Sequence, residues 1–293
     1  MSRPSCDIDL EAAEFVLDPY PQLAAQRRAR PIGWHEASRT WMVVAHEHCN
    51  AVLRDRRFGR VWHDRTPVER FEPFNLLHRN HMMENEPPNH SRLRRQVSTA
   101  FARGHIERMR PRVSALGREP LGEVGGEQFD VLADFAEPLP VLVISEPLGA
   151  PRADAARFRR WAQAIVKMYE PTVTPDVEEA ALAASATFAD YIRALMARRR
   201  HQLRDDLLSD LLRAQDGADG LSDHEVLKSA VLRLNAGHQA SVNVFGSGLA
   251  ALLAAPHQWA RLELADSPGR RPTFVLRGYR TLPVAGSRAG VPR

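Results

Sequence analysis

A polar heptapeptide stands in the middle of one of the most apolar stretches of the chain. It reads Asn235-Ala236-Gly237-His238-Gln239-Ala240-Ser241 and is flanked by residues rich in Val, Leu and Ala. A small residue followed by glycine lets a flat group approach the backbone closely. The polar residues that follow can hydrogen-bond a water or a small ligand. The residue types and their spacing therefore indicate a place for a bound water or small ligand.

This heptapeptide must be positioned by a long helix. Ser222 is followed three residues later by Glu225, a capping box that is typical of a helix start. Pro256 cannot continue a helix and predicts its end. The roughly 32 residues between them span about 48 Å, enough to cross a domain. The middle of the segment is apolar nearly all round, which predicts a helix buried in a core.

A second pair with chemical potential is His90 and Arg94. They are four residues apart in a segment that begins at Asn89, so a helix places both on one face. Two cationic or donor groups on one face suit carboxylates or phosphates. A solvated arginine-rich face explains the same spacing equally well, and the sequence leaves both interpretations open.

The run His46-Glu47-His48-Cys49 resembles a metal cluster in composition only. Residues one and two apart on a helix point in different directions, so these side chains converge poorly on one ion. A helix end with a packed cysteine is the better interpretation. No metal ligands are predicted.

Composition bounds the function of the 293-residue chain. The 40 basic and 36 acidic residues leave a net charge of +4, too small to predict nucleic-acid binding, and nearly all the basic residues are arginine. The two cysteines, Cys6 and Cys49, exclude a disulfide framework and fit a reducing compartment. The first fifteen residues contain no apolar run, so we expect no membrane anchor and a cytoplasmic location.

The remaining segments predict a mainly α fold with a few short strands. A first helix is expected to end near Arg30, and a β-hairpin follows over 33–44. We expect a helix over 46–54, a long irregular and functional loop to Pro88, and a helix over 90–101. The apolar stretch 129–148 predicts a buried helix with broken ends. Amphipathic helices over 151–170 and 177–204 and a short helix over 205–213 precede the long one.

In this order the segments resemble the bacterial cytochrome P-450 family. The matching stretches are VLRDRRFGR (52–60), ENEPPNHSRLRRQVSTAF (84–101), FDVLADFAEPLPVLVISEPLGAP (129–151), LNAGHQASVNVFGSGLAALLAAPHQWARL (234–262) and RRPTFVLRGYRTLPV (270–284). The resemblance covers most of residues 8–284. It implies one incomplete cytochrome P-450 domain over 1–293, with a long central helix.

The resemblance also implies roles for individual residues. His90 and Arg94 fall where the family contacts haem propionates. Ala236 and Gly237 fall where the central helix passes over haem and oxygen. Gln239 falls on the acidic proton-delivery position, Ala240 on the position where an alcohol is common, and Ser241 one residue later. Arg92, Arg95 and Arg103 are expected near the face that docks an acidic electron donor.

The sequence departs from the family after the central helix. A helix with Glu-x-x-Arg and the loop Phe-x-x-Gly-x-x-x-Cys, whose cysteine ligates haem iron, are expected there and do not occur. The segments before and after meet near Arg261 and Leu262, which predicts a deletion near 261–264. Haem b is therefore expected from the family without its axial cysteine.

Three functions are consistent with this pattern. The first is a haem-dependent monooxygenase of secondary metabolism, which oxidises a small organic substrate with O2 and electrons from a ferredoxin-type donor, but which is inactive as encoded. The second is a haem-free helper of a sugar transferase or another biosynthetic enzyme. The third is a non-functional deletion product.

Overall fold

A computed structural model gives the fold. It describes residues 3–99, 103–123, 128–170, 172–217, 219–255, 262–264, 269–270, 279–281 and 283–286. Contacts divide the chain into two compact units. Unit 1 comprises Met1–Gly59, Tyr169–Thr172 and Arg270–Arg277, and unit 2 comprises Arg60–Met168, Val173–Gly269 and Gly278–Arg293. The prediction of one domain over 1–293 stays a prediction, because a division by packing does not define a family domain.

Unit 1 is built on a β-hairpin and short helices. Strands β1 (Ile32–His35) and β2 (Thr40–Val43) pair antiparallel with Trp34 opposite Trp41, as the hairpin prediction requires. Helices α1 (Ala13–Leu17) and α2 (Tyr20–Ala29) precede it, and α3 (His46–Arg54) follows. A small core of Cys6, Ile8, Leu10 and Phe15 is buried beside them.

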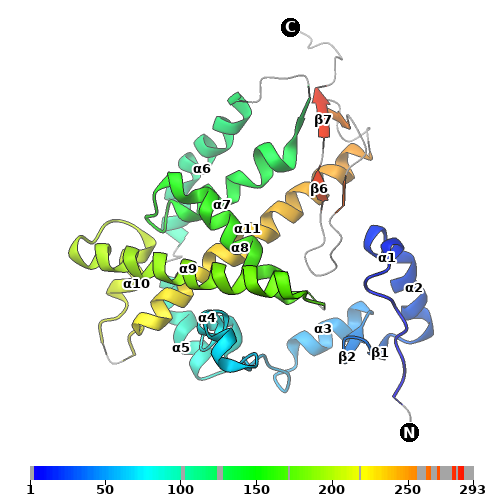
Figure 1. Cartoon of the computed structure of the whole chain (residues 1–293). Coiled ribbons are helices and arrows are strands. Elements are labelled where there is room, and N and C mark those ends of the chain that lie inside the picture. Colours follow the sequence, from blue (N-terminus) through cyan, green and yellow to red (C-terminus); the bar gives the residue numbers. More distant parts are fainter. Residues whose placement is uncertain are drawn as a thin grey trace. The chain divides into compact units, whose positions relative to one another are not determined.

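Unit 2 contains the long helices, which are labelled in Figure 1. Its helical elements are α4 (Val68–His78), η1 (Met82–Glu84), α5 (Asn89–Thr99), α6 (Arg103–Glu123), η2 (Leu132–Ala136), α7 (Pro138–Ser145), η3 (Arg152–Asp154), α8 (Ala155–Val166), α9 (Pro175–His201), α10 (Leu207–Arg213) and α11 (Asp223–Leu253). A further 3-10 turn, η4 (Lys167–Tyr169), follows α8. The helices expected over 90–101, 151–170, 177–204 and 205–213 are therefore confirmed, with shifted ends.

The strands of unit 2 are short. Strand β7 (Pro283–Gly286) lies between β3 (Gln128–Asp130) and β4 (Leu262–Leu264) and is antiparallel to both. Strand β6 (Tyr279–Thr281) also belongs to this unit, and β5 (Gly269–Arg270) falls at the boundary of the two units in the sequence. The predicted deletion near 261–264 falls partly at Arg261, which lies outside the described residues, and it remains a prediction.

The prediction of an irregular loop over 60–88 is wrong in the middle of that range, where α4 forms. Pro73 lies inside this helix, and a proline in a helix interior normally costs about 3 kcal/mol. Tertiary packing offsets that cost. Phe71, Phe74 and Leu77 are buried on the face that packs against α9.

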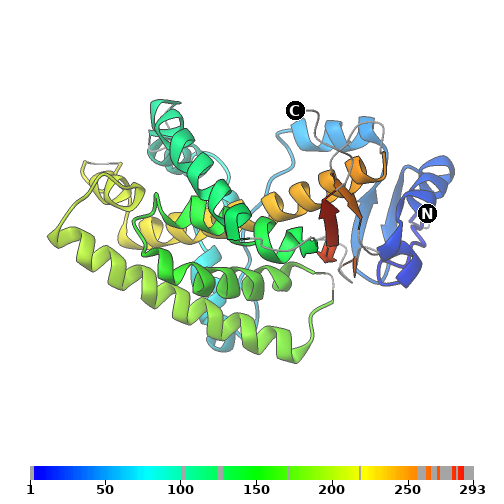
Figure 2. The same cartoon turned by 90° about the horizontal axis from the view of Figure 1, so that it is seen from above.

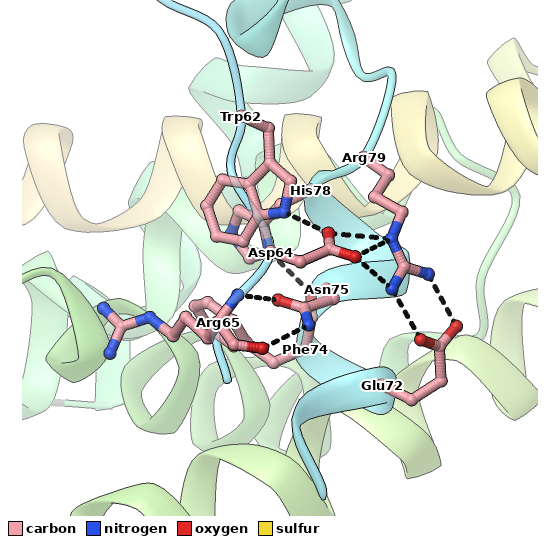
Figure 3. A network of polar contacts seen from close by, with 8 residues as sticks. All are labelled: Trp62, Asp64, Arg65, Glu72, Phe74, Asn75, His78 and Arg79. Carbon is pink, nitrogen blue, oxygen red and sulfur yellow. Dashed lines mark hydrogen bonds and ion pairs between the residues drawn. The ribbon is translucent and has the colours of Figure 1, made fainter. Parts of the chain in front are cut away.

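A polar network fixes the preceding segment to α4 (Figure 3). The side-chain amide of Asn75 donates to the Arg65 carbonyl at 3.0 Å, and its carbonyl accepts from the Arg65 N–H at 2.9 Å. Arg79 donates to both Asp64 and Glu72, with shortest distances of 2.6 and 2.7 Å. The same close-up shows Trp62, Phe74 and His78, and the ring of His78 stacks on each of the other two.

The prediction of a single buried helix over 129–148 is wrong. It is divided into β3, the π-helical stretch η2 and α7. The prolines explain the division, because Pro138 and Pro140 lack an N–H and so favour the first turn of a new helix. Val141 and Leu142 on α7 are nevertheless buried, as the apolar pattern predicts.

The core of unit 2 lies between α8, α9 and α11. Phe158 and Phe188 are fully buried there, and the ring of Trp161 stacks on Phe188 at a centroid distance of 5.2 Å. One buried ion pair joins α9 to the start of α10, where Arg199 Nε lies 2.5 Å from an Asp206 carboxylate oxygen. Figure 2, turned by 90°, again shows α9 and α11 as the long helices of this unit.

Candidate functional site

The predicted start of the long helix is confirmed at atomic detail. Ser222 is the N-cap of α11, and its hydroxyl accepts from the Glu225 N–H at 3.3 Å. The Glu225 carboxylate in turn accepts from the Ser222 N–H at 2.8 Å. The helix ends at Leu253, while Pro256 lies outside the described residues.

The prediction that α11 is buried all round is wrong. One face is buried and carries His238, Gln239 and Val242, each no more than 4% exposed. The opposite face carries Ala236, Ala240, Ser241 and Gly248 and is exposed along its length. On that face Val244 is 75% exposed and Phe245 41% exposed. The apolar pattern alone could not show this, because it does not tell which face a neighbouring element covers.

Three of the predicted site residues meet at one cavity. Its volume is about 560 Å³, and α5, α7, α10, α11 and η1 enclose it. The lining residues are Met82, Met83, Arg94, Val97, Ser98, Ile144, Leu207, Leu211, Ser229, Leu232, Arg233, Ala236 and Gly237. Arg94, Ala236 and Gly237, which are separated by about 140 residues in sequence, are thus brought together by the packing of α5 on the helices around α11.

Arg94 differs from the other arginines of α5. Arg92 forms an ion pair with Glu225, and Arg95 pairs with Asp219 at 3.0 Å. Within the part of the chain that the structure describes, Arg94 forms no ion pair. Arg94 is exposed and also lines the cavity, so the two interpretations that the sequence left open for this helix, anion binding and a solvated face, both stay open.

The pairing of Arg92 and Arg95 bears on the expected donor-docking face. Arg92 is partly buried in its pair, while the Arg95–Asp219 pair is exposed on both sides. An exposed pair contributes little stability and exchanges readily with solvent or a partner. The side chain of Arg103 lies outside the described residues. The docking face stays a prediction.

Arg233 is a cavity residue that sequence reasoning missed. It lies three and four residues before Ala236 and Gly237, so the helix places all three on neighbouring positions of one face. Burial lowers the pKa of its guanidinium to about 10. The signal that could have found it is this helical spacing, which puts a strongly basic residue one turn before the small residues of the heptapeptide.

The other predicted residues lie apart from the cavity lining. His90 is half-buried on α5 and does not line the cavity. Gln239 lies on the buried face of α11, with its Nε2 3.4 Å from the His238 Nδ1. Ala240 and Ser241 lie on the exposed face, where the Ser241 hydroxyl donates to the Gly237 carbonyl at 2.7 Å.

Gly237 has a packing role besides the one inferred from the sequence. A Cβ at this position would lie 2.4 Å from the Cδ1 of Ile144 on α7. The absence of a side chain therefore lets α7 approach α11 closely. Gly248 is different, because no described atom lies within 4 Å of a Cβ placed there.

The residues that line the cavity are suited to contact part of a haem. Arg94 supplies a cation for an anionic edge, and the small side chain of Ala236 in the cavity wall leaves room beside it for a flat ring. It offers no thiolate for iron. Cys6 is 3% exposed within the core of unit 1, and the Cys49 thiol donates to the Val43 carbonyl at 3.2 Å. Neither cysteine lines the cavity.

Comparison with known proteins places this chain in a family. No protein-family profile matches it. It is 37% identical over 271 residues to the cytochrome P-450 monooxygenase PikC of Streptomyces venezuelae, covering 89% of this chain and 62% of that protein. It is 36% identical over 261 residues to the mycinamicin IV hydroxylase/epoxidase of Micromonospora griseorubida, covering 88% of this chain and 62% of that protein.

The solved structures agree in fold. The crystal structure of P450BioI in complex with an acyl carrier protein superposes with a TM-score of 0.87 at 19% identity, covering 94% of this chain and 100% of that chain. The chain belongs to the cytochrome P-450 family. It spans about three fifths of the length of the curated relatives it matches. Within the described residues, no helix has both the length and the hydrophobicity that a membrane crossing requires.

Proposed function

We propose that this chain forms the oxygen-facing side and the anionic edge of a haem site in a monooxygenase of secondary metabolism. The observation that carries the proposal is the cavity that joins Arg94 to Ala236 and Gly237 in a chain of this family. The substrate is a small organic molecule, and the electron donor is of the ferredoxin type. Support for secondary metabolism comes from relatives such as the mycinamicin IV hydroxylase/epoxidase.

When bound, haem supplies one-electron and O2 chemistry that amino-acid side chains lack. The Arg94 guanidinium would pair with a propionate, because its planar fork matches a carboxylate. Ala236 and Ala240 would leave room for the ring and for a small ligand above it.

The groups at the proton-delivery positions are less able to transfer a proton than the acidic and alcohol side chains expected there from the family. Gln239 cannot ionise, so it can orient a water but cannot release a proton at neutral pH. The Ser241 hydroxyl donates to the Gly237 carbonyl, so its oxygen can only accept a further hydrogen bond while that contact lasts. We therefore propose that the chain as it stands is inactive in oxygen activation, also because neither of its cysteines lines this cavity.

Haem titration tests this function. Purified chain is titrated with haem, and binding is followed by absorbance for the wild type, Arg94→Met and Arg95→Met. Loss of one charge-assisted contact should weaken binding roughly tenfold, or about 1.4 kcal/mol, in Arg94→Met. Arg95→Met is the matched control, because Arg95 pairs with Asp219 and does not line the cavity. Equal affinity in all three proteins would contradict the role of Arg94.

A spectroscopic measurement tests the missing thiolate. The haem-loaded chain is reduced under carbon monoxide, and its Soret band is compared with that of an intact family member. We expect no thiolate-type band. Its appearance would show that Cys6 or Cys49 reaches the iron, and Cys6→Ser and Cys49→Ser would identify which.

The exposed apolar face of α11 favours a second candidate, a haem-free helper of a sugar transferase or another biosynthetic enzyme. Val244, at 75% exposure, and Phe245 are available to a second polypeptide. A helper would raise the turnover of its partner without haem. Val244→Asp should remove that effect, and an unchanged turnover on adding the wild-type chain would exclude this function.

A further inference from the structure

Lys228 carries a buried amine that the proposed function does not use. It lies on α11, three residues after Glu225, and is 5% exposed. A lysine is almost never buried to this extent unless its charge is paired. Within the described residues, however, Lys228 forms no hydrogen bond and no ion pair. The chain has only one other lysine, Lys167, which is exposed on η4.

The carboxylates whose charges act on Lys228 are already held by arginines. They are Glu72 on α4, which packs against α11, and Glu225 on α11 itself. Both oxygens of Glu72 accept from the Arg79 guanidinium at 2.7 Å (Figure 3). Both oxygens of Glu225 accept from Arg92. Each carboxylate is thus bound by the two-pronged guanidinium of an arginine, which leaves the amine of Lys228 without a partner of its own.

Burial has the largest effect on this amine. Because removal from water disfavours a charged ammonium, it lowers the pKa of Lys228. Glu225 and Glu72 oppose this lowering, and Arg79 adds to it. The charge of Lys228 in turn helps to lower the pKa of His81, which follows α4. At a given pH, Lys228 therefore has more of its amine in the neutral, nucleophilic form than a fully solvated lysine has.

The surroundings of Lys228 favour a compact, anionic electrophile. The side chains of Glu72 and Arg79 are 48% and 28% exposed, so the charged cluster on α4 is open to solvent. Lys228 itself is exposed only slightly, which favours a small reagent over a bulky one. Acylation turns the amine into a neutral amide, and a neutral group costs less to bury than an ammonium. A short acyl phosphate meets these requirements.

We propose that Lys228 is a site of acylation by small acyl phosphates. The neutral amine attacks the carbonyl carbon, so that a nitrogen–carbon bond forms and the bond from this carbon to the phosphate oxygen breaks. Phosphate leaves with the electron pair, and the surplus proton of the amine passes to water. The amide product removes one positive charge at the contact of α4 with α11. The reaction needs no haem and does not depend on the proposed function.

The exposed Lys167 is an internal reference for the test. The haem-free full chain is treated with acetyl phosphate at pH 7.5, and acetylation of each lysine is followed by mass spectrometry. Lys228 should react at least about twofold faster than Lys167, because even a small lowering of an amine pKa multiplies its neutral fraction. Reaction at Lys167 that is equally fast or faster would overturn the proposal.

The pH dependence separates nucleophilicity from access. The ratio of the Lys228 rate to the Lys167 rate should fall as the pH rises toward about 10, where an exposed lysine also loses its proton. A ratio that stays constant or rises would overturn the proposal, because a difference in access alone does not change with pH.

Unfolding separates the effect of the fold from that of the neighbouring sequence. In guanidinium chloride both lysines are in water, so they should be acetylated at equal rates. A preference for Lys228 that survives unfolding would overturn the proposal, because burial could not then be its cause.

Two variants of α4 test the electrostatic part. Glu72→Gln removes a charge that favours the ammonium, so it should speed acetylation of Lys228 and leave that of Lys167 unchanged. Glu69→Gln is the matched control, because Glu69 is exposed on α4 and forms no ion pair within the described part of the chain. Circular dichroism reports whether each variant is folded. A folded Glu72→Gln with an unchanged or slower reaction at Lys228 would contradict the proposal, and if this variant does not fold, the wild-type pH dependence decides.

Discussion

Acid should destabilise unit 2 through His78. This histidine is 2% exposed, and its ring stacks on Phe74 and Trp62 at centroid distances of 4.2 and 4.6 Å. Burial lowers its pKa from 6.5 to about 4, against the opposing effect of its hydrogen bond to the Phe74 carbonyl. His81 lies 5.9 Å away in the same stack, and burial lowers its pKa as well.

The direction of the pH effect on stability follows from the pKa of His78 in the unfolded and the folded chain. The unfolded chain protonates His78 near pH 6.5, whereas the folded chain resists protonation down to about pH 4. Stability is therefore complete above pH 6.5 and is lost as the pH falls toward 4. The full difference corresponds to about 3 kcal/mol, and at pH 5 the loss from this one residue is about 2 kcal/mol.

The assay is urea unfolding at pH 7.5 and pH 5, followed by circular dichroism. His78→Phe keeps an aromatic ring in the stack and removes the titrating group. Between the two pH values the wild type should lose about 2 kcal/mol more than His78→Phe. The exposed His224 provides a control, and His224→Gln should lose as much as the wild type. If His78→Phe and the wild type lose the same amount, the argument from burial is refuted.

Four further stability predictions rest on the packing of unit 2, each measured as the free energy of unfolding in urea. Arg199→Met should destabilise the chain by about 3–5 kcal/mol, because it leaves Asp206 buried without its partner at 2.5 Å; a loss below about 1 kcal/mol would contradict this. Gly149→Ala should cost at least about 2 kcal/mol, since φ is +76° and a Cβ would lie 2.2 Å from an Asp206 oxygen. Gly248→Ala is its matched opposite, because the position is helical and open, so it should gain about 0.5–1 kcal/mol. Ser222→Ala should cost about 1 kcal/mol by removing the N-cap of α11, and an unchanged midpoint would show that the cap is dispensable.

The sequence by itself determined the local boundaries of the fold. The capping box at Ser222 was predicted and found, and the hairpin predicted over 33–44 was found over 32–43, because caps and tight turns depend on groups only a few residues apart. The order of segments was also sufficient to indicate the family, which the comparisons confirm. The sequence further showed that only two cysteines are present, which limits what can ligate iron.

Tertiary structure decided everything that depends on partners distant in sequence. Helix α4 forms around Pro73 because its aromatic face is buried on α9, a contact that no local pattern encodes. The arginines of α5 look alike in sequence, yet Arg92 and Arg95 meet carboxylates about 130 residues away while Arg94 lines a cavity.

The central helix shows most clearly which properties the sequence determines and which depend on tertiary structure. Its apolar residues predicted burial on all sides, but hydrophobicity only makes burial favourable and cannot supply the element that covers a face. The described chain covers the face of Gln239 and leaves that of Ala240 and Val244 exposed. The fold also brings Arg233 of α11 and Arg94 of α5 to the wall of one cavity, although they lie about 140 residues apart in the sequence.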